Sequence, residues 1–302
     1  MKRIYIIIIA VFALIQVSEA QQQPLYSQYM LNSFLLNPGI TGTEEIIPIR
    51  LTARQQWTGI DGAPQTQAIS AHSALGRSKE MGVGGFIYND KFGPIGRTGI
   101  MGTYSYKIRI KSDTKLSFGL SLSAFQYKMD ETNINIIDES DVVFTGSTET
   151  SIVPDANFGA YLYNPKYFAG FSSTQLFQFQ IKLDGSTNLS KIVRHYYVTA
   201  GYRFKAGESF EIEPSFLVKT TAYNMPQLDL NARFFYKKNY WLAFSYRTED
   251  AVIAMLGLKV DKYYIGYAFD YTLSNLINYS SGSHEIMLGI DLGKVEETKS
   301  LF

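Results

Sequence analysis

Hydrophobic and polar residues alternate with a period of two along most of the chain. Residues 262–271 show the alternation most clearly, because tyrosine, isoleucine and phenylalanine occupy every second position, with Gly266, Ala268 and Asp270 between them. Segments such as 114–126 repeat the pattern. A period of two is typical of a β-strand whose two faces meet different surroundings. The alternation therefore predicts an all-β protein built from two-faced strands.

Fourteen segments of this kind follow one another, and most are about ten residues long. They cover residues 49–56, 66–74, 81–89, 98–108, 114–126, 156–163, 167–173, 193–204, 209–219, 227–237, 240–248, 251–260, 262–271 and 284–293. Roughly ten residues is the length of a strand that crosses a bilayer at a tilt. An even number of strands places both termini of the chain on one side of a closed barrel. The pattern predicts a transmembrane antiparallel β-barrel of about 14 strands.

The connections between these segments fall into two classes that alternate along the chain. The longer connections are 57–64, 90–96, 128–154, 174–192 and 272–282, and the tight ones include 164–165, 205–208, 237–239 and 261–262. Bacterial outer membrane barrels have short periplasmic turns and longer extracellular loops. The alternative, a soluble antiparallel sandwich, needs few exposed aromatic residues and no such asymmetry. We therefore expect an integral protein of the outer membrane.

The two faces of each strand differ in polarity, which predicts that they meet different surroundings. The apolar face should meet lipid, with tyrosines at strand ends forming aromatic girdles, namely Tyr196, Tyr202, Tyr236, Tyr240 and Tyr271. The other face carries charges of both signs: Arg203, Glu211, Glu213, Asp229, Arg233, Arg247, Asp270 and Asp291. Because hydrocarbon offers no hydrogen-bond partners, these charges should face the lumen. Mixed signs there predict cross-strand ion pairs or a wet interior.

Composition removes several other classes of protein. The chain has 302 residues, 15% of them aromatic and 18% charged, and no cysteine, which excludes disorder, thiol chemistry and a lipoprotein anchor. Residues 1–20 have a basic start, a short apolar run and a small-residue cleavage site, so they read as a signal peptide. The remaining chain has balanced charges, which gives no support for nucleic-acid binding. Residues 294–302 form a C-terminal tail after the last predicted strand.

Two distinctive motifs lie near the start of the chain, and the first of them has two parts, residues 24–32 and 37–42. Residues 24–32 read P-L-Y-S-Q-Y-M-L-N, residues 37–42 read N-P-G-I-T-G, and residues 56–67 read Q-W-T-G-I-D-G-A-P-Q-T-Q. In this combination and order they resemble the PorP/SprF family of type IX secretion outer membrane proteins of Bacteroidota. The family usually ends the second part of the first motif with Ala-Tyr-Ala-Gly, and residues 39–42 of this chain, G-I-T-G, depart mildly from that ending. Residues 21–48 are expected to be a periplasmic or lumenal segment before a barrel at 49–293.

The resemblance implies a non-enzymatic component of the type IX secretion system. Such a protein binds, anchors or assists export of cell-surface cargo with a C-terminal sorting domain, for example gliding adhesins. Some relatives bind a periplasmic OmpA-like peptidoglycan-binding lipoprotein instead. The motif residues are the candidate partner-binding positions: Tyr26, Ser27, Gln28, Tyr29, Asn37, Pro38, Gln56, Trp57, Gly59, Gly62, Ala63 and Pro64. For the first motif, residues 24–32 and 37–42, a purely structural role beneath or inside the barrel is an equal alternative to partner binding. For the second motif, residues 56–67, the alternative to a cargo contact is a tight surface loop.

Other functions receive less support from the sequence. A passive porin or a FadL-like transporter is the main alternative, since fourteen strands can enclose a lumen. Whether residues 21–48 occlude that lumen separates the two hypotheses. His72, His195 and His284 lie on different predicted strands without ligand spacing, so neither a metal site nor catalysis is expected. The acidic stretch 130–155 lacks calcium-loop spacing and is expected to be a solvated surface loop. No cofactor is expected.

Overall fold

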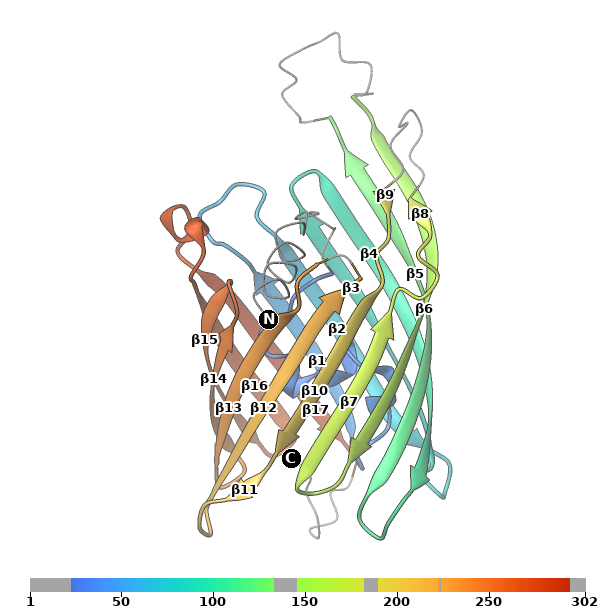
Figure 1. The fold of residues 1–302 in the computed structure, drawn as a ribbon, viewed down its shortest axis with the longest axis vertical. Helices are drawn as coiled ribbons and strands as arrows, with labels where there is room; N and C mark the ends of the chain where they lie inside the picture. The colour runs from blue at the N-terminus through green and yellow to red at the C-terminus, as the bar shows by residue number, and fades with distance from the viewer. Residues whose placement is uncertain (1–22, 133–145, 182–189, 223, 294–302) are drawn as a thin grey trace, which may run out of the picture.

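The computed structural model describes residues 23–132, 146–181, 190–222 and 224–293. Within them, fourteen strands form one closed antiparallel barrel (Figure 1). The wall consists of β1 (Ile47–Gln55), β2 (Gln65–Leu75), β3 (Met81–Phe92), β4 (Ile95–Arg109), β5 (Lys115–Asp130), β6 (Thr148–Tyr163), β7 (Tyr167–Thr174), β10 (His195–Tyr202), β12 (Phe210–Thr221), β13 (Gln227–Tyr236), β14 (Tyr240–Arg247), β15 (Ala251–Val260), β16 (Tyr263–Thr272) and β17 (Ser283–Leu292). Each strand pairs with its neighbours in the chain, and β1 closes the barrel against β17.

Short elements complete the fold. The two-residue strand β11 (Phe204–Lys205) pairs with β12, and β8 (Gln180–Ile181) with β9 (Ser190–Lys191) forms a small ladder between β7 and β10. Three turns of 3₁₀-helix precede β1, namely η1 (Tyr29–Leu31), η2 (Ser33–Leu35) and η3 (Pro38–Ile40), and η4 (Asn275–Asn278) lies between β16 and β17. No helix among the described residues is long and apolar enough to cross a membrane.

The alternation predicted from the sequence is confirmed in the wall. Along β14, the outward positions Leu242, Phe244 and Tyr246 are exposed, while Ala243 and Ser245 are buried towards the lumen. An apolar outer face is stable only against hydrocarbon, and the polar inner face finds hydrogen-bond partners inside. All fourteen predicted strands are present, so the barrel is confirmed as an outer membrane fold.

Two connections differ from the prediction. β5 and β6 stay paired as far as Asp130 and Thr148, so much of the expected loop 128–154 is a hairpin that rises above the rest of the wall. The exposed side of β5 changes there from Leu122 to Gln126, because the hairpin has left the lipid. The connection expected at 90–96 is a two-residue turn at Gly93-Pro94. Residues 133–145 of the acidic stretch lie outside the described residues.

The barrel has two unlike ends. We name the end with the connections 56–64, 175–194 and 273–282 the long-loop end, and the end with the tight turns, where β1 begins, the short-turn end. Residues 23–46 occupy the lumen, drawn in blue in Figure 1. Gln23 lies near the long-loop end, where its side chain contacts Tyr197 and Thr174. The sequence did not decide whether this segment lies in the periplasm or in the lumen. In the structure, its described residues lie in the lumen.

Candidate functional site

The segment 23–46, which we call the plug, crosses the lumen and is bonded to strands all around the wall. Its backbone and side chains reach β1, β2, β4, β6, β7, β10, β12, β13, β14, β16 and β17. Its apolar residues fill gaps in the inner face, as when Phe34 and Ile40 pack against Met101. The plug is therefore part of the folded barrel and obstructs its lumen.

The first anchor of the plug is the pair Ser27 and Gln28, both fully buried. Their backbone N–H groups donate to the two oxygens of the Glu285 carboxylate, at 2.6 and 2.9 Å. The Ser27 hydroxyl donates to Asp270, whose carboxylate forms an ion pair with Arg54 at 2.7 Å. A buried carboxylate is costly unless it is paired and hydrogen-bonded. Here the plug supplies donors that the wall carboxylates need.

The second anchor is the turn at Asn37 and Pro38. The Asn37 side chain accepts from Gly39 N at 2.8 Å, and the following proline begins η3, as expected for an N-cap followed by N1 proline. The same side chain donates to the carbonyls of Ala160 and Phe171, at 3.1 and 3.3 Å. This asparagine therefore shapes the turn and ties it to β6 and β7.

Glycines in the wall make room for the plug. They are Gly82 on β3, Gly119 on β5, Gly159 on β6 and Gly266 on β16. A Cβ on Gly119 would lie 2.2 Å from the Pro38 carbonyl, and one on Gly159 would lie 2.0 Å from Asn37 Oδ1. Side-chain carbons do not approach other atoms so closely, so only glycine allows the plug to seat at this depth. These four positions are a functional signal that the motif analysis missed.

The last part of the plug is held at the short-turn end. The Ser105 hydroxyl donates to the Thr41 carbonyl at 2.6 Å, and Gly42 N donates to His72 Nδ1 at 3.1 Å. Glu44 follows, with one carboxylate oxygen 3.9 Å from His72 Nε2. Burial raises the pKa of the Glu44 carboxyl to about 7, although the nearby Arg50 guanidinium opposes the increase.

The lumenal charges are paired, as the mixed signs predicted. Glu213 accepts from both Arg203, at 2.6 Å, and Arg233. Arg247 is fully buried and lies 3.1 Å from Asp229. Arg233 and Arg247 also donate to plug carbonyls, so the ion pairs of the wall extend to the plug.

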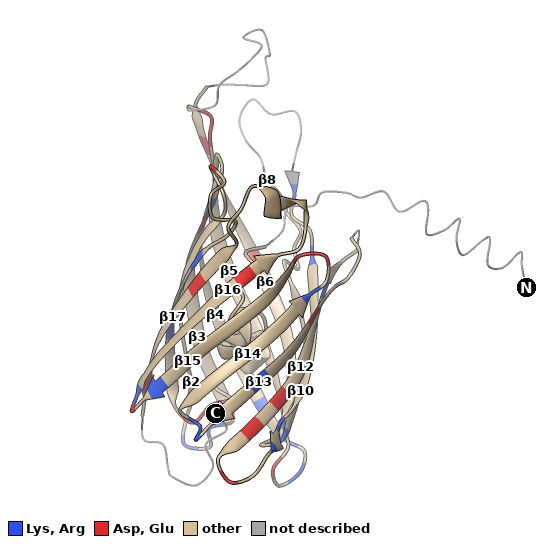
Figure 2. Cartoon of the chain, turned by 90° about the vertical axis from the view of Figure 1, so that its left-hand side faces the viewer, with Lys and Arg blue, Asp and Glu red and all other residues tan. Residues whose placement is uncertain are grey.

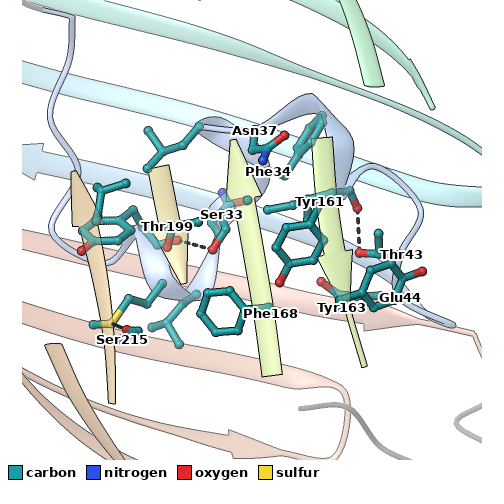
Figure 3. Close-up of a pocket in the computed structure, with 18 of the residues that line it drawn as sticks. Ser33, Phe34, Asn37, Thr43, Glu44, Tyr161, Tyr163, Phe168, Thr199 and Ser215 are labelled. Carbon is teal, nitrogen blue, oxygen red and sulfur yellow. Dashed lines mark hydrogen bonds between the residues drawn. The ribbon is translucent and has the colours of Figure 1, made fainter. Parts of the chain in front are cut away.

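A cavity of about 100 Å³ lies between the plug and strands β6, β7, β10, β12 and β13 (Figure 3). Tyr161, Tyr163 and Phe168 gather on its wall side, and Ser33 and Glu44 belong to the plug. The lining reaches the turn at 164–166, so the cavity belongs to the short-turn end. It can hold several water molecules but is well below the roughly 300 Å³ of small-molecule pockets.

The second predicted motif forms a braced loop at the long-loop end. Trp57 N donates to the Ser283 hydroxyl at 3.0 Å, and Thr58 exchanges backbone hydrogen bonds of 2.8 Å with Gly282 and Ser281. On its other side, the Gly62 carbonyl accepts from Gly93 at 2.7 Å. Loops 56–64 and 273–282 therefore form one platform, and the turn at 93–94 supports it.

The twelve predicted partner-binding residues are thus divided between two places. Tyr26, Ser27, Gln28, Tyr29, Asn37 and Pro38 are buried in the plug, whereas Gln56, Trp57, Gly59, Gly62, Ala63 and Pro64 form the platform loop. Within that loop, Gly59 and Gly62 are exposed and Ala63 is buried. The structure adds Tyr279, which is 75% exposed on the same platform. Its only sequence signal is an aromatic residue in a polar loop.

Metal-binding or catalytic geometry does not emerge from the described part of the chain. Among those residues, no group of three or more His, Asp or Glu side chains is arranged to hold a metal ion. His72 and His195 are buried on different strands, and His284 contacts the Tyr267 hydroxyl at 2.7 Å.

Comparisons with known proteins agree with the fold and identify the family. The Ralstonia pickettii toluene transporter TbuX superposes with a TM-score of 0.51 at 9% identity, covering 86% of this chain and 92% of that one. A Pseudomonas aeruginosa FadL homologue gives 0.44 at 10% identity, with 84% and 91% covered. The NalP translocator domain from Neisseria meningitidis gives 0.46 at 9% identity, with 89% and 96% covered.

The likeness to TbuX, at 9% identity, shows the barrel fold alone. No curated protein sequence matches the chain. The sequence profile described as type IX secretion system membrane protein PorP/SprF matches residues 18–290, nearly the whole chain. The two motifs of the plug and the platform lie inside that match, together with the wall from β1 to β16 and β17 as far as residue 290. The chain belongs to the PorP/SprF family of type IX secretion system membrane proteins.

Proposed function

We propose that this protein is a closed, non-enzymatic outer membrane barrel that holds secreted cargo at the cell surface. The observation that carries the proposal is the plug, which crosses the lumen and bonds to eleven strands of the wall. In a barrel closed in this way, partners bind at the two ends, and the contacts inside the lumen stabilise the fold. The long-loop end faces the medium, as is usual for outer membrane barrels.

The cargo-binding surface is the platform of loops 56–64 and 273–282. Its backbone bonds hold Trp57 and Tyr279 on a stable support, and large aromatic side chains on rigid supports commonly dominate binding energy. Cargo with a C-terminal sorting domain, as the family resemblance implies, would reach this surface from outside. A periplasmic OmpA-like lipoprotein would instead meet the short-turn end, where the cavity beside the plug lies.

The experiment is affinity capture of the tagged protein from its native outer membrane in mild detergent, with mass spectrometry of the bound proteins. We expect a large secreted protein to be retained by the natural sequence and lost from the double variant Trp57→Ala, Tyr279→Ala. Phe244→Ala, which removes an aromatic side chain from the lipid face, is the control and should retain the cargo. Cargo retained by the double variant would remove the platform from this account.

A passive pore or a FadL-like transporter is the alternative function. The plug makes it less favoured, because it obstructs the lumen through which a solute would pass. The sequence hypothesis made occlusion by residues 21–48 the deciding feature, and the cavity beside the plug has room only for several water molecules. Planar-bilayer recording separates the two functions. A silent barrel is expected, and steady single-channel current from the natural sequence would favour the pore.

A further inference from the structure

The two ends of the barrel carry opposite net charge. The six tight connections, residues 76–80, 110–114, 164–166, 203–209, 237–239 and 261–262, hold nine lysines and arginines against four acidic residues. Within the described residues, the connections at the long-loop end hold four acidic residues against two basic ones. Figure 2 shows blue residues at several of the tight turns. The short-turn end is therefore a basic rim.

Part of this rim points sideways, towards lipid. The Lys237 ammonium lies over the Tyr236 ring, 5.3 Å from its centroid, and the Lys262 ammonium lies over Tyr263 at 5.4 Å. Both tyrosines are exposed on the outer face at strand ends, the position of an aromatic girdle. A lysine that folds over such a ring places its charge at the level of the lipid headgroups.

The turn at Lys237 and Lys238 holds these cations in an unfavourable backbone conformation. The φ angles of the two lysines are 48° and 60°, both in the left-handed region. β-turns with left-handed φ at both central residues prefer Asn-Gly, since left-handed φ costs other residues free energy. Strain of this sort points to a function for the residues that carry it.

Neighbouring turns keep the cations together. Lys237 N donates to the Ser209 carbonyl at 2.8 Å, and Lys259 N donates to the Asn239 carbonyl at 2.7 Å, which ties the end of β15 to the turn after β13. Within the described residues, Lys237, Lys238 and Lys262 form no ion pair with a carboxylate. Three positive charges thus lie on adjacent turns beside exposed aromatic rings.

We propose that Lys237, Lys238 and Lys262, together with Tyr236 and Tyr263, bind the phosphate groups of anionic phospholipids at the short-turn end. Lysine ammonium groups bind phosphate as point charges, and basic residues near a membrane surface attract anionic lipid. A lipid is favoured over an acidic protein because the tyrosines that carry two of the charges belong to the outer, lipid-facing wall. With the orientation given above, these lipids lie in the periplasmic leaflet. The proposal does not depend on cargo binding.

The test reconstitutes the barrel in nanodiscs of phosphatidylethanolamine, with or without phosphatidylglycerol, and counts retained lipids by native mass spectrometry. The natural sequence should retain phosphatidylglycerol preferentially. In Lys237→Asn, Lys238→Gly, Lys262→Asn the preference should fall by roughly fivefold for each lysine removed. Asn-Gly suits the turn, so this variant should fold, and glutamine at all three positions is the second variant if it does not.

The control removes three lysines from the opposite end, Lys91→Asn, Lys128→Asn and Lys191→Asn, and should keep the preference. Two results would overturn the proposal. One is equal retention of both lipids by the natural sequence, which would favour an acidic protein as the partner of the basic rim. The other is an unchanged preference in the triple variants of the basic rim.

Discussion

The plug should be displaced by adding two methyl groups to the wall. In Gly119→Ala, Gly159→Ala, the new carbons would lie 2.2 Å from the Pro38 carbonyl and 2.0 Å from Asn37 Oδ1, so the turn must move away. The move breaks both Asn37 bonds to the wall and the 2.6 Å bond from the Ser172 hydroxyl to the Leu36 carbonyl. At about 1 kcal/mol for each bond, the loss is about 3 kcal/mol. That corresponds to roughly a hundredfold larger displaced population.

Hydrogen exchange of the plug amides measures this population directly. We expect faster exchange across residues 28–42 in the double variant, with the strand amides unchanged and the heat-modifiable gel mobility of a folded barrel preserved. Gly102→Ala is the matched control, because a Cβ at that position meets no atom within 4 Å. Exchange in the double variant no faster than in Gly102→Ala would refute the argument that glycines seat the plug.

Three further changes test other parts of the lumen. Glu285→Ala removes the acceptor of two plug amides, and exchange at Ser27 and Gln28 should rise at least tenfold, while Glu285→Gln should recover part of the loss. Arg247→Ala leaves Asp229 buried without its partner and should lower the free energy of unfolding in urea by about 3–5 kcal/mol. The raised pKa of Glu44 favours its neutral form, so the protection of the plug amides, measured relative to the intrinsic exchange rate at each pH, should fall as the pH rises from about 4.5 to about 7, and Glu44→Gln should abolish that fall.

The wall was predictable because its signal is local. Each strand shows its two faces within ten residues, and lipid on one side with a polar lumen on the other makes the alternation strict. The ends of strands were less predictable, as the hairpin of β5 and β6 shows. Above the lipid, the outer face no longer has to be apolar, so Lys128 gave the last residues of β5, beyond the predicted strand 114–126, the appearance of a loop.

The path of the plug was not predictable, because it depends on distant residues. Ser27 is satisfied by Asp270 and Glu285, more than 240 residues away, and Asn37 depends on a glycine in β6. Nothing within the motif itself reveals those partners. Glycines at inward positions of several strands were the available signal, since an inner face of a barrel with an empty lumen has no need to omit side chains.

Plug and wall should separate in a fixed order during unfolding. The wall is held by a continuous backbone ladder of fourteen strands, whereas the plug is held largely by side-chain bonds such as those of Asn37 and Glu285. Water replaces such bonds at little net cost when it can reach them, so the plug belongs to the low-stability part of the molecule. Exchange measured at increasing urea should therefore release residues 26–43 before any strand. Simultaneous loss of protection in plug and wall would mean that the plug is needed for closure of the barrel, and that its motifs are conditions of folding.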